Sequence, residues 1–317
     1  MIIFVELTLI NVFPEIRFIS EIGFAELKVH IKKSDRVNCY IVSKYLVFLR
    51  SSSNSSFTMR LLHILLISAC LLAFTATAQG HNDTIRVMTF NLHAGHDASL
   101  QQLGQFIKQY QPDFVALQEV DHYTRRANCP QQNDRDFITE LAYYSGMQGF
   151  FGPTINFSGG HYGTGLLSRH QFVDVHNIKL PHPVDRMEQR GLLQGTFVLA
   201  DGDTIMMACT HLEAFDSVSR AAQAQFILDR FSCTALPVIL AGDFNASPDD
   251  PVMGLLMSQW TDCTTNDFTF SVKSPSKKID YILTQPKQAW HTIDSHVIPV
   301  EMSDHYPVIA TLVLTRN

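Results

Sequence analysis

The sequence predicts an α/β fold in which mixed β-sheets are covered by helices. Between residues 84 and 145, apolar runs of strand length alternate with segments of helical spacing. Further along the chain strand-like runs predominate, which favours mixed sheets over purely parallel ones. No linker or repeat interrupts residues 79–317, and these 239 residues are enough for one large domain with a sizeable core.

The first three elements have the clearest patterns. Residues 84–92 (TIRVMTFNL) are β-branched and aromatic, as in a buried strand. Residues 98–110 place Leu100, Leu103 and Phe106 at helical spacing before Pro112 stops the helix, and residues 114–120 (FVALQEV) form a second buried strand. The same two patterns predict helices at 136–145 and 217–231, and strands at 165–167, 192–199, 204–209, 237–241, 280–284 and 308–314.

Residues 59–78 have the parts of a secretory signal peptide. Met59 and Arg60 precede residues 61–78 (LLHILLISACLLAFTATA), which contain no Asp, Glu, Lys or Arg and end in a small-x-small triplet. We therefore expect a secreted or periplasmic protein, with residues 1–58 an upstream extension that the native protein lacks. A membrane anchor is less favoured, because eighteen apolar residues barely cross a bilayer. The lipoprotein-like box ISAC at 67–70 is weaker still, because apolar residues follow its Cys.

The expected mature chain, residues 79–317, is acidic. It holds 16 Lys and Arg against 25 Asp and Glu, a net charge of −9, whereas the whole chain carries −6. Proteins that bind long nucleic acids through their phosphates usually have a basic surface, which an acidic chain of this kind does not suggest. The mature chain also keeps four cysteines without a zinc-like spacing, and export would permit a disulfide between Cys233 and either Cys263 or Cys129.

Polar residues suited to catalysis stand at the ends of the apolar strands, in six places. A buried Glu in the strand 114–120 would be costly unless it were paired or bound to metal. Oxygen ligands without Cys or a paired His motif favour Mg²⁺, with Mn²⁺ or Ca²⁺ as alternatives, over zinc. Carboxylates, Asn and His around a hard cation are what water attack on phosphorus requires. The six places are Asn91, Glu119, His211, Asp243 with Asn245, Asp280, and Asp304 with His305.

Four of these segments, in this order, resemble the endonuclease/exonuclease/phosphatase superfamily of Mg²⁺-dependent phosphoesterases, which includes DNase I. They are FN at 90–91, LQEV at 117–120, GDFN at 242–245 and SDHYPV at 303–308. The resemblance covers essentially all of 84–314 and implies a DNase I-like fold, a four-layered α/β sandwich of two mixed β-sheets packed face to face with helices outside. The THLEA segment and compact loops look more like the sphingomyelinase-like and glycolipid-remodelling branch than like DNA-repair enzymes.

The resemblance implies a role for each matched residue. Glu119 is similar to the principal metal ligand, Asn91 to its neighbour that places metal or phosphate, and Asp304 to a further metal ligand or an orienting partner of the adjacent His. Asp243 resembles the residue that orients or deprotonates the attacking water. Asn245 resembles the residue that binds the phosphate and the transition state.

Two histidines and one more carboxylate complete the implied catalytic set. His305 is similar to a general base or phosphate-binding His, and His211 to a second active-site His. Asp280 resembles the carboxylate that pairs with an active-site His.

Two further segments add substrate-binding candidates. Residues 159–169 match the family's GxGLLSR strand, before which many members place a phosphate-contacting Tyr, so either His161 or Tyr162 is expected to reach the phosphate. Residues 188–191 (EQRG) resemble an E-x-R-G turn of related hydrolases, in which Arg190 would bind a second anionic group or form a surface salt bridge.

Three functions are compatible with this pattern. We favour a secreted, monomeric, metal-dependent phosphoesterase that hydrolyses a phosphodiester or phosphomonoester, either a small molecule or a membrane lipid headgroup. An exported non-specific nuclease is the first alternative, and the acidic charge weighs against it. A non-catalytic binding relative is the second, and it predicts lost catalytic residues, whereas the strongest positions are all present.

Overall fold

The computed structural model describes residues 19–21, 24–26 and 84–315, which belong to two compact units, 1–81 and 82–317. In the first unit, β1 (Ile19–Glu21) and β2 (Phe24–Glu26) form an antiparallel pair. The predicted signal peptide at 59–78 lies outside the described residues. No helix in the described part of the chain is long and apolar enough to cross a membrane.

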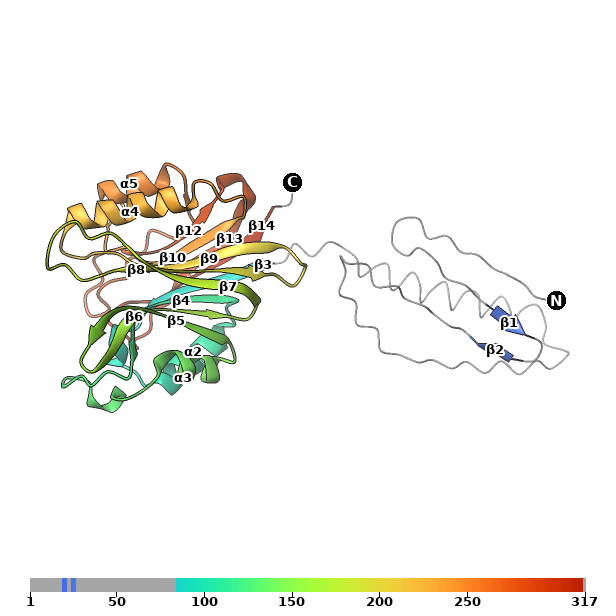
Figure 1. The fold of residues 1–317 in the computed structure, drawn as a ribbon, viewed down its shortest axis with the longest axis horizontal. Coiled ribbons are helices and arrows are strands. Elements are labelled where there is room, and N and C mark those ends of the chain that lie inside the picture. The colour runs from blue at the N-terminus through green and yellow to red at the C-terminus, as the bar shows by residue number, and fades with distance from the viewer. Residues whose placement is uncertain (1–18, 22–23, 27–83, 316–317) are drawn as a thin grey trace. The chain divides into compact units, whose positions relative to one another are not determined.

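The second unit contains two six-stranded sheets of mixed direction (Figure 1). In spatial order the first sheet comprises β13 (Trp290–Val297), β14 (Val308–Leu314), β3 (Thr84–Asn91), β4 (Phe114–His122), β6 (Gly160–Ser168) and β5 (Gln148–Phe157). The second comprises β11 (Thr261–Asp262), β12 (Asp280–Gln285), β10 (Val238–Asp243), β9 (Thr204–His211), β8 (Gly191–Val198) and β7 (Gln171–Lys179).

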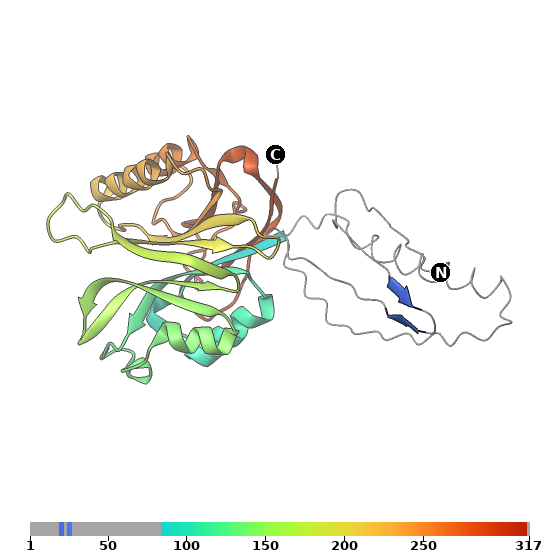
Figure 2. The same cartoon turned by 45° about the vertical axis from the view of Figure 1, so that its right-hand side comes forward.

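Four helices cover the outer faces of the sheets, two on each side, as Figures 1 and 2 show. They are α2 (Leu100–Tyr110), α3 (Phe137–Ser145), α4 (Ser217–Phe231) and α5 (Pro251–Met257). Side chains of α2 and α3 bury against the first sheet, and those of α4 and α5 against the second. A third apolar cluster, which includes Phe114 and Phe197, fills the space between the sheets. The predicted four-layered sandwich is confirmed.

Strand direction brings one edge of each sheet to the same end of the sandwich. β3 and β4 are parallel neighbours in the first sheet, and β9 and β10 are parallel neighbours in the second, so each pair ends at one edge. β12 and β14 run antiparallel to β10 and β3 and therefore begin at these edges. The ends of strands in mixed α/β sheets are where loops can gather functional side chains around one point.

The strands that the sequence analysis did not predict are mostly those at sheet edges. β7 is almost entirely exposed and β13 is exposed at alternate residues, so neither has the continuous apolar run of a buried strand. The predicted strand 165–167 lies in the C-terminal half of the longer β6. The disulfide that export would permit is not formed: Cys129, Cys209, Cys233 and Cys263 are all free thiols.

Candidate active site

Asp243 lies at the centre of the candidate active site. It is the last residue of β10, and its register partners are His211 on β9 and Asp280 on β12. Its carboxylate is 1 % exposed and accepts hydrogen bonds from the Asn91 side-chain amide (3.1 Å) and the backbone N–H of Asn245 (2.9 Å). Because Asn91 ends β3, the first of these bonds joins the two sheets at their common edge.

Two imidazoles point at the same carboxylate oxygen. His305 Nε2 lies 3.7 Å from Oδ2 of Asp243, and His211 Nε2 lies 3.5 Å from it. The other ring nitrogen of His305, Nδ1, is 2.9 Å from Oδ2 of Asp280, and the Phe270 ring lies against the imidazole with 4.7 Å between centroids. The carboxylate of Asp280 therefore fixes the orientation of His305 toward Asp243.

Burial and charge give these three groups different protonation behaviour. Burial and the neighbouring charge of Asp280 raise the pKa of Asp243 to about 7. Burial alone would lower the pKa of His305, but the carboxylates of Asp280 and Asp243 outweigh it and raise this pKa to about 10. Burial, with the charges of Arg190 and His305, lowers the pKa of His211 well below its usual range. At neutral pH His305 is therefore protonated, His211 is neutral and Asp243 is near its titration point.

Glu119 enters the site through an irregularity of β4. The register between β4 and β6 shifts between Leu117 and Val120, and Glu119 has a positive φ of 57°. Such a bulge turns a side chain away from the face that strand alternation would give it. The Glu119 carboxylate accepts a hydrogen bond from the Asn91 amide (3.3 Å), the same amide that binds Asp243.

The segment before β14 is tied to the end of β3. Ser303 donates its hydroxyl proton to the backbone carbonyl of Asn91 (2.6 Å) and accepts the backbone N–H of His305 (3.3 Å). Asp304, half-buried, lies with one carboxylate oxygen 3.8 Å from Nδ1 of His93 in the short 3-10 helix η1 (His93–Gly95). The six strand-end places predicted from the sequence thus gather at one edge of the two sheets.

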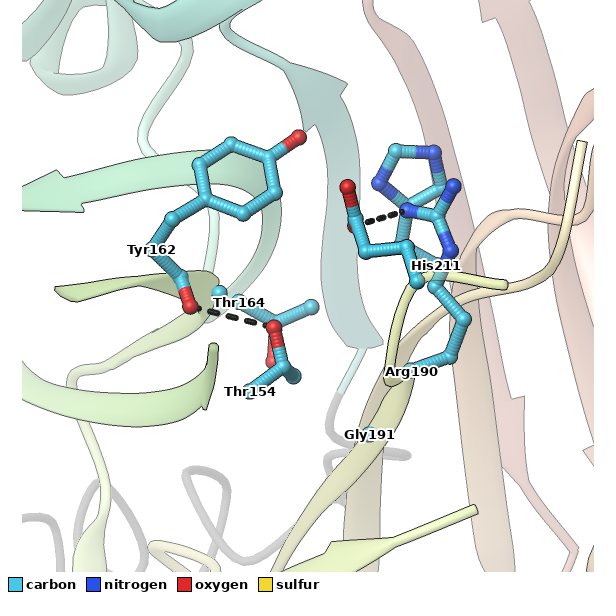
Figure 3. A pocket seen from close by; sticks show the side chains of 8 residues that line it. Thr154, Tyr162, Thr164, Arg190, Gly191 and His211 are labelled. Carbon is cyan, nitrogen blue, oxygen red and sulfur yellow. Dashed lines mark hydrogen bonds and ion pairs between the residues drawn. The ribbon is translucent and has the colours of Figure 1, made fainter. Parts of the chain in front are cut away.

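A pocket adjoins His211. It is lined by Tyr162, Arg190 and His211, with Thr154, Gly163, Thr164, Glu188 and Gly191. Tyr162 lies on one side of the pocket and Arg190 and His211 on the other (Figure 3). Burial, with the charges of Glu119 and Glu188, raises the pKa of the Tyr162 hydroxyl well above its usual range, so this hydroxyl keeps its proton and can donate a hydrogen bond.

Arg190 is buried between two carboxylates. Its Nη1 is 2.9 Å from Oε1 of Glu188, and its Nε is 3.6 Å from Oε2 of Glu213. Glu213 is 1 % exposed; its carboxylate faces the guanidinium of Arg190, and its backbone carbonyl accepts a hydrogen bond from Arg220 Nη1 (2.8 Å). Burial raises the pKa of Glu188, with Arg190 acting in the opposite direction. The salt bridge expected as an alternative for Arg190 is present, but it lies inside the pocket rather than on the surface.

The structure separates the two candidates for the phosphate contact on β6. Tyr162 is 8 % exposed and lines the pocket, whereas His161 is exposed and lies near His122, outside the gathered residues. Asn245, after β10, has a φ of 49° and donates its side-chain amide to the Leu212 carbonyl (3.0 Å), which fixes it beside Asp243. Successive side chains of a strand point to opposite faces of the sheet, which explains why His161 and Tyr162 lie in different surroundings.

The sequence did not single out the two carboxylates that face Arg190. Glu188 lies two residues before Arg190, and Glu213 follows His211 by two residues in THLEA. An acidic residue directly after a buried strand was the available signal for Glu213. Its pairing with Arg190 depends on a contact between β8 and the end of β9 that spacing alone does not specify.

One cluster of ligand-type atoms is compact enough to hold an ion among the described residues. It consists of Asp243, Asp280 and His305, whose ligand atoms lie within 4.8 Å of one another. Its ligand atoms already contact one another: His305 Nδ1 lies 2.9 Å from Asp280 Oδ2, and His305 Nε2 lies 3.7 Å from Asp243 Oδ2. These contacts, with the raised pKa of His305, favour a proton-transfer and charge network at this trio. The oxygens of Glu119, Asn91 and Asp304 are the better donors for a hard cation.

Carboxylates and imidazoles gathered at one edge of two packed sheets suit the hydrolysis of a phosphoester bond. A model of the Endonuclease/Exonuclease/phosphatase family matches residues 88–305. The chain belongs to this family.

The relatives differ in how much they share with the chain. Rat nocturnin is 29 % identical over 162 residues, which are 46 % of this chain and 35 % of that protein, so the chain spans about a third of its relative's length. An endonuclease/exonuclease/phosphatase from Beutenbergia cavernae has the same fold with a TM-score of 0.62 and 22 % identity, over 73 % of this chain and 72 % of that chain. A mannosyl-6-phosphatase from Bacteroides thetaiotaomicron also has this fold, with a TM-score of 0.58 and 17 % identity, over 73 % of this chain and 100 % of that chain.

Proposed function

We propose that this protein is a metal-dependent phosphoesterase that hydrolyses a phosphodiester or phosphomonoester by direct attack of water. The observation that supports this most strongly is the convergence on Asp243 Oδ2 of one amide and two imidazoles. Hydrolysis needs one group that accepts a proton from water and others that donate to the charged oxygens of the transition state. Both kinds of group lie within 4 Å of this atom.

A divalent cation fits the donors at this edge. Glu119, Asn91 and Asp304 would hold it, because they offer hard oxygens and because the buried carboxylates otherwise leave an excess of negative charge. We propose Mg²⁺, with Mn²⁺ or Ca²⁺ as alternatives. When bound, the ion would neutralise charge on the phosphoryl oxygens and lower the pKa of nearby water.

Asp243 is the proposed proton acceptor. A pKa raised toward neutrality is what general base catalysis at neutral pH favours. His305, protonated and oriented by Asp280, then donates to a phosphoryl oxygen rather than acting as the base. Neutral His211 and the amide of Asn245 are the further phosphate contacts from the second sheet.

Two side chains that line the pocket beside His211 are the proposed contacts for the substrate beyond the catalytic residues. Tyr162 would donate its hydroxyl to the phosphate, and Arg190 would attract a second anionic group. Large apolar side chains are exposed on the loops that follow the catalytic strands, including Phe215 (93 %) and Tyr123 (50 %). This exposure and the net charge of −9 over residues 79–317 support a small or lipid-linked phosphoester over a long nucleic acid. The signal-like residues 59–78 support action outside the cytoplasm.

A substrate panel tests this proposal. The purified protein is incubated with Mg²⁺ or Mn²⁺ and, separately, bis-p-nitrophenyl phosphate, p-nitrophenyl phosphate, sphingomyelin vesicles, RNA and supercoiled plasmid. We expect hydrolysis of at least one of the first three substrates to be faster than any nucleic acid cleavage. Rapid plasmid nicking would favour the exported nuclease instead, and inactivity on every substrate with every metal would favour a non-catalytic relative.

A further inference from the structure

One arginine in the loop that follows β4 binds a carboxylate on that same strand. Arg126 donates from Nε and Nη2 to the two carboxylate oxygens of Asp121 (2.6 and 2.9 Å). Asp121 is 1 % exposed and also accepts the hydroxyl proton of Thr124 (2.7 Å). A two-point bond between a planar guanidinium and a buried carboxylate fixes the guanidinium in one plane.

The fixed guanidinium lies against the ring of Tyr162. The central carbon of Arg126 is 4.5 Å from the centroid of the Phe157 ring and 5.3 Å from that of Tyr162, and the two ring centroids are 6.2 Å apart. Asp121 and Tyr162 are also direct partners in the pairing of β4 with β6. The ring of Tyr162 is therefore flanked by the guanidinium and by Phe157, next to its strand partner Asp121, and Tyr162 also lines the pocket.

We propose that Asp121 and Arg126 are positioning residues that hold Tyr162 in the orientation in which its hydroxyl reaches the substrate phosphate. The proposal rests on the proposed function, because it takes Tyr162 as a phosphate contact. Contacts of an arginine with aromatic faces restrict ring orientation as well as adding attraction. Substrate-binding side chains depend on neighbours that lock their rotamers, and a small displacement of such a group lowers the rate.

The neighbouring Arg125 provides a matched control. Its Nε lies 2.8 Å from Asp134, but both side chains are largely exposed, 71 % and 56 %, and the pair makes no ring contact with Tyr162. An exposed pair of this kind contributes little. Arg126, by contrast, is only 15 % exposed. The two arginines differ in burial and in contact with the ring, while they share a loop and a charge and each pairs with one aspartate, Asp134 for Arg125 and Asp121 for Arg126.

A double-mutant cycle tests the coupling. R126Q and R125Q are made in the native background and in the Y162F background, and kcat/KM is measured on the best substrate of the panel. We expect R126Q to lower kcat/KM about three- to tenfold in the native background and much less in Y162F, because contacting residues are coupled. R126K, which keeps the charge but loses the planar fork, should restore part of the rate, and R125Q should have no effect. An equal loss from R126Q in both backgrounds would overturn the proposal.

A second measurement does not require activity. Tyrosines are labelled with 3-fluorotyrosine, and the ¹⁹F signal of Tyr162 is identified by its absence in Y162F. We expect R126Q to shift or broaden this signal and R125Q to leave it unchanged, with thermal unfolding confirming that both variants fold. If R126Q does not fold, R126K is measured in the same way. An unmoved Tyr162 signal would overturn the positioning role even in an active enzyme, whereas a moved signal in an inactive protein would support it and reject only the proposed function.

Discussion

At the scale of single residues, the site concentrates charge that works against folding. Asp243 is buried beside Asp280, and these two effects raise its pKa to about 7 from an ordinary value of 3.8. A raised carboxyl pKa means that the folded state resists the charged form. The resulting loss of stability is absent below pH 4, grows as the pH rises toward 7 and is complete above it. Stability is thus lower than an uncharged residue at this position would allow.

The first prediction follows from the destabilising effect of the Asp243 charge at high pH. Replacement of Asp243 by Asn removes the charge, keeps the shape and still allows a contact with Asn91. We expect D243N to unfold at least about 3 °C above the native protein at pH 8 in EDTA, since roughly 1 kcal/mol shifts the Tm of a domain of this size by about 2–4 °C. At pH 4 the difference should shrink or vanish. Thermal unfolding followed by circular dichroism at the two pH values checks this, and a lower Tm for D243N at pH 8 would contradict it.

The neighbouring residues of β6 give a second prediction. Tyr162 lines the pocket and His161 is exposed on the other side of the strand. We expect Y162F to lower kcat/KM about tenfold or more, because a hydrogen-bond donor to a charged group is lost. H161A should leave the rate within about twofold. The opposite ranking in steady-state assays would show that the strand presents its other face to the substrate.

At the scale of the elements, the site depends on how closely β10 approaches β9. A Cβ at Gly242, next to Asp243, would lie 2.1 Å from the backbone carbonyl oxygen of Thr210 on β9. Backbone atoms of a central strand cannot move aside as a flexible side chain does. Gly242 therefore sets the separation of the two strands that carry Asp243 and His211.

A glycine pair provides the third prediction. We expect G242A to push β10 from β9 and to destabilise the protein by about 2 kcal/mol or more, the range of overpacked core positions. Gly254, in α5, has open space where its Cβ would be, so G254A should be neutral or stabilise by up to about 1 kcal/mol through helix propensity. Urea unfolding of both variants measures these changes, and equal stabilities would contradict the close approach.

The element scale also shows what the sequence could predict. Strands buried on both faces, such as β3 and β10, have continuous apolar runs and were predicted near their observed bounds. The edge strands β7 and β13 were not, because exposure removes that pattern. Strand-end residues such as Asp243 could be identified because the apolar run marks where its strand stops. Arg126 could not, because its contacts depend on how a loop without a motif folds back.

At the scale of the whole molecule, the two sheets bring the ends of β3, β4, β9 and β10 to one edge, and that edge is acidic. A divalent cation bound there would stabilise the folded state by mass action. As a fourth prediction, Mg²⁺ at about 100 times its dissociation constant should raise the Tm of the native protein by roughly 5 °C or more. E119Q, which loses the charge of a proposed ligand, should respond much less. Differential scanning calorimetry across a Mg²⁺ titration checks this. Equal Tm shifts for the native protein and E119Q would show that Glu119 is not a metal ligand.

The central claim is that this acidic edge hydrolyses phosphoesters with a metal and with Asp243 as the proton acceptor. Release of p-nitrophenol from bis-p-nitrophenyl phosphate, measured at pH 7.5 for the native protein and for D243N with Mg²⁺ and with EDTA, tests it most directly. We predict release that requires Mg²⁺ and falls more than tenfold in D243N, because general base catalysis usually contributes about 10²–10⁴-fold. Release that persists in EDTA, or a folded D243N that keeps more than about a tenth of the native rate, would contradict the account.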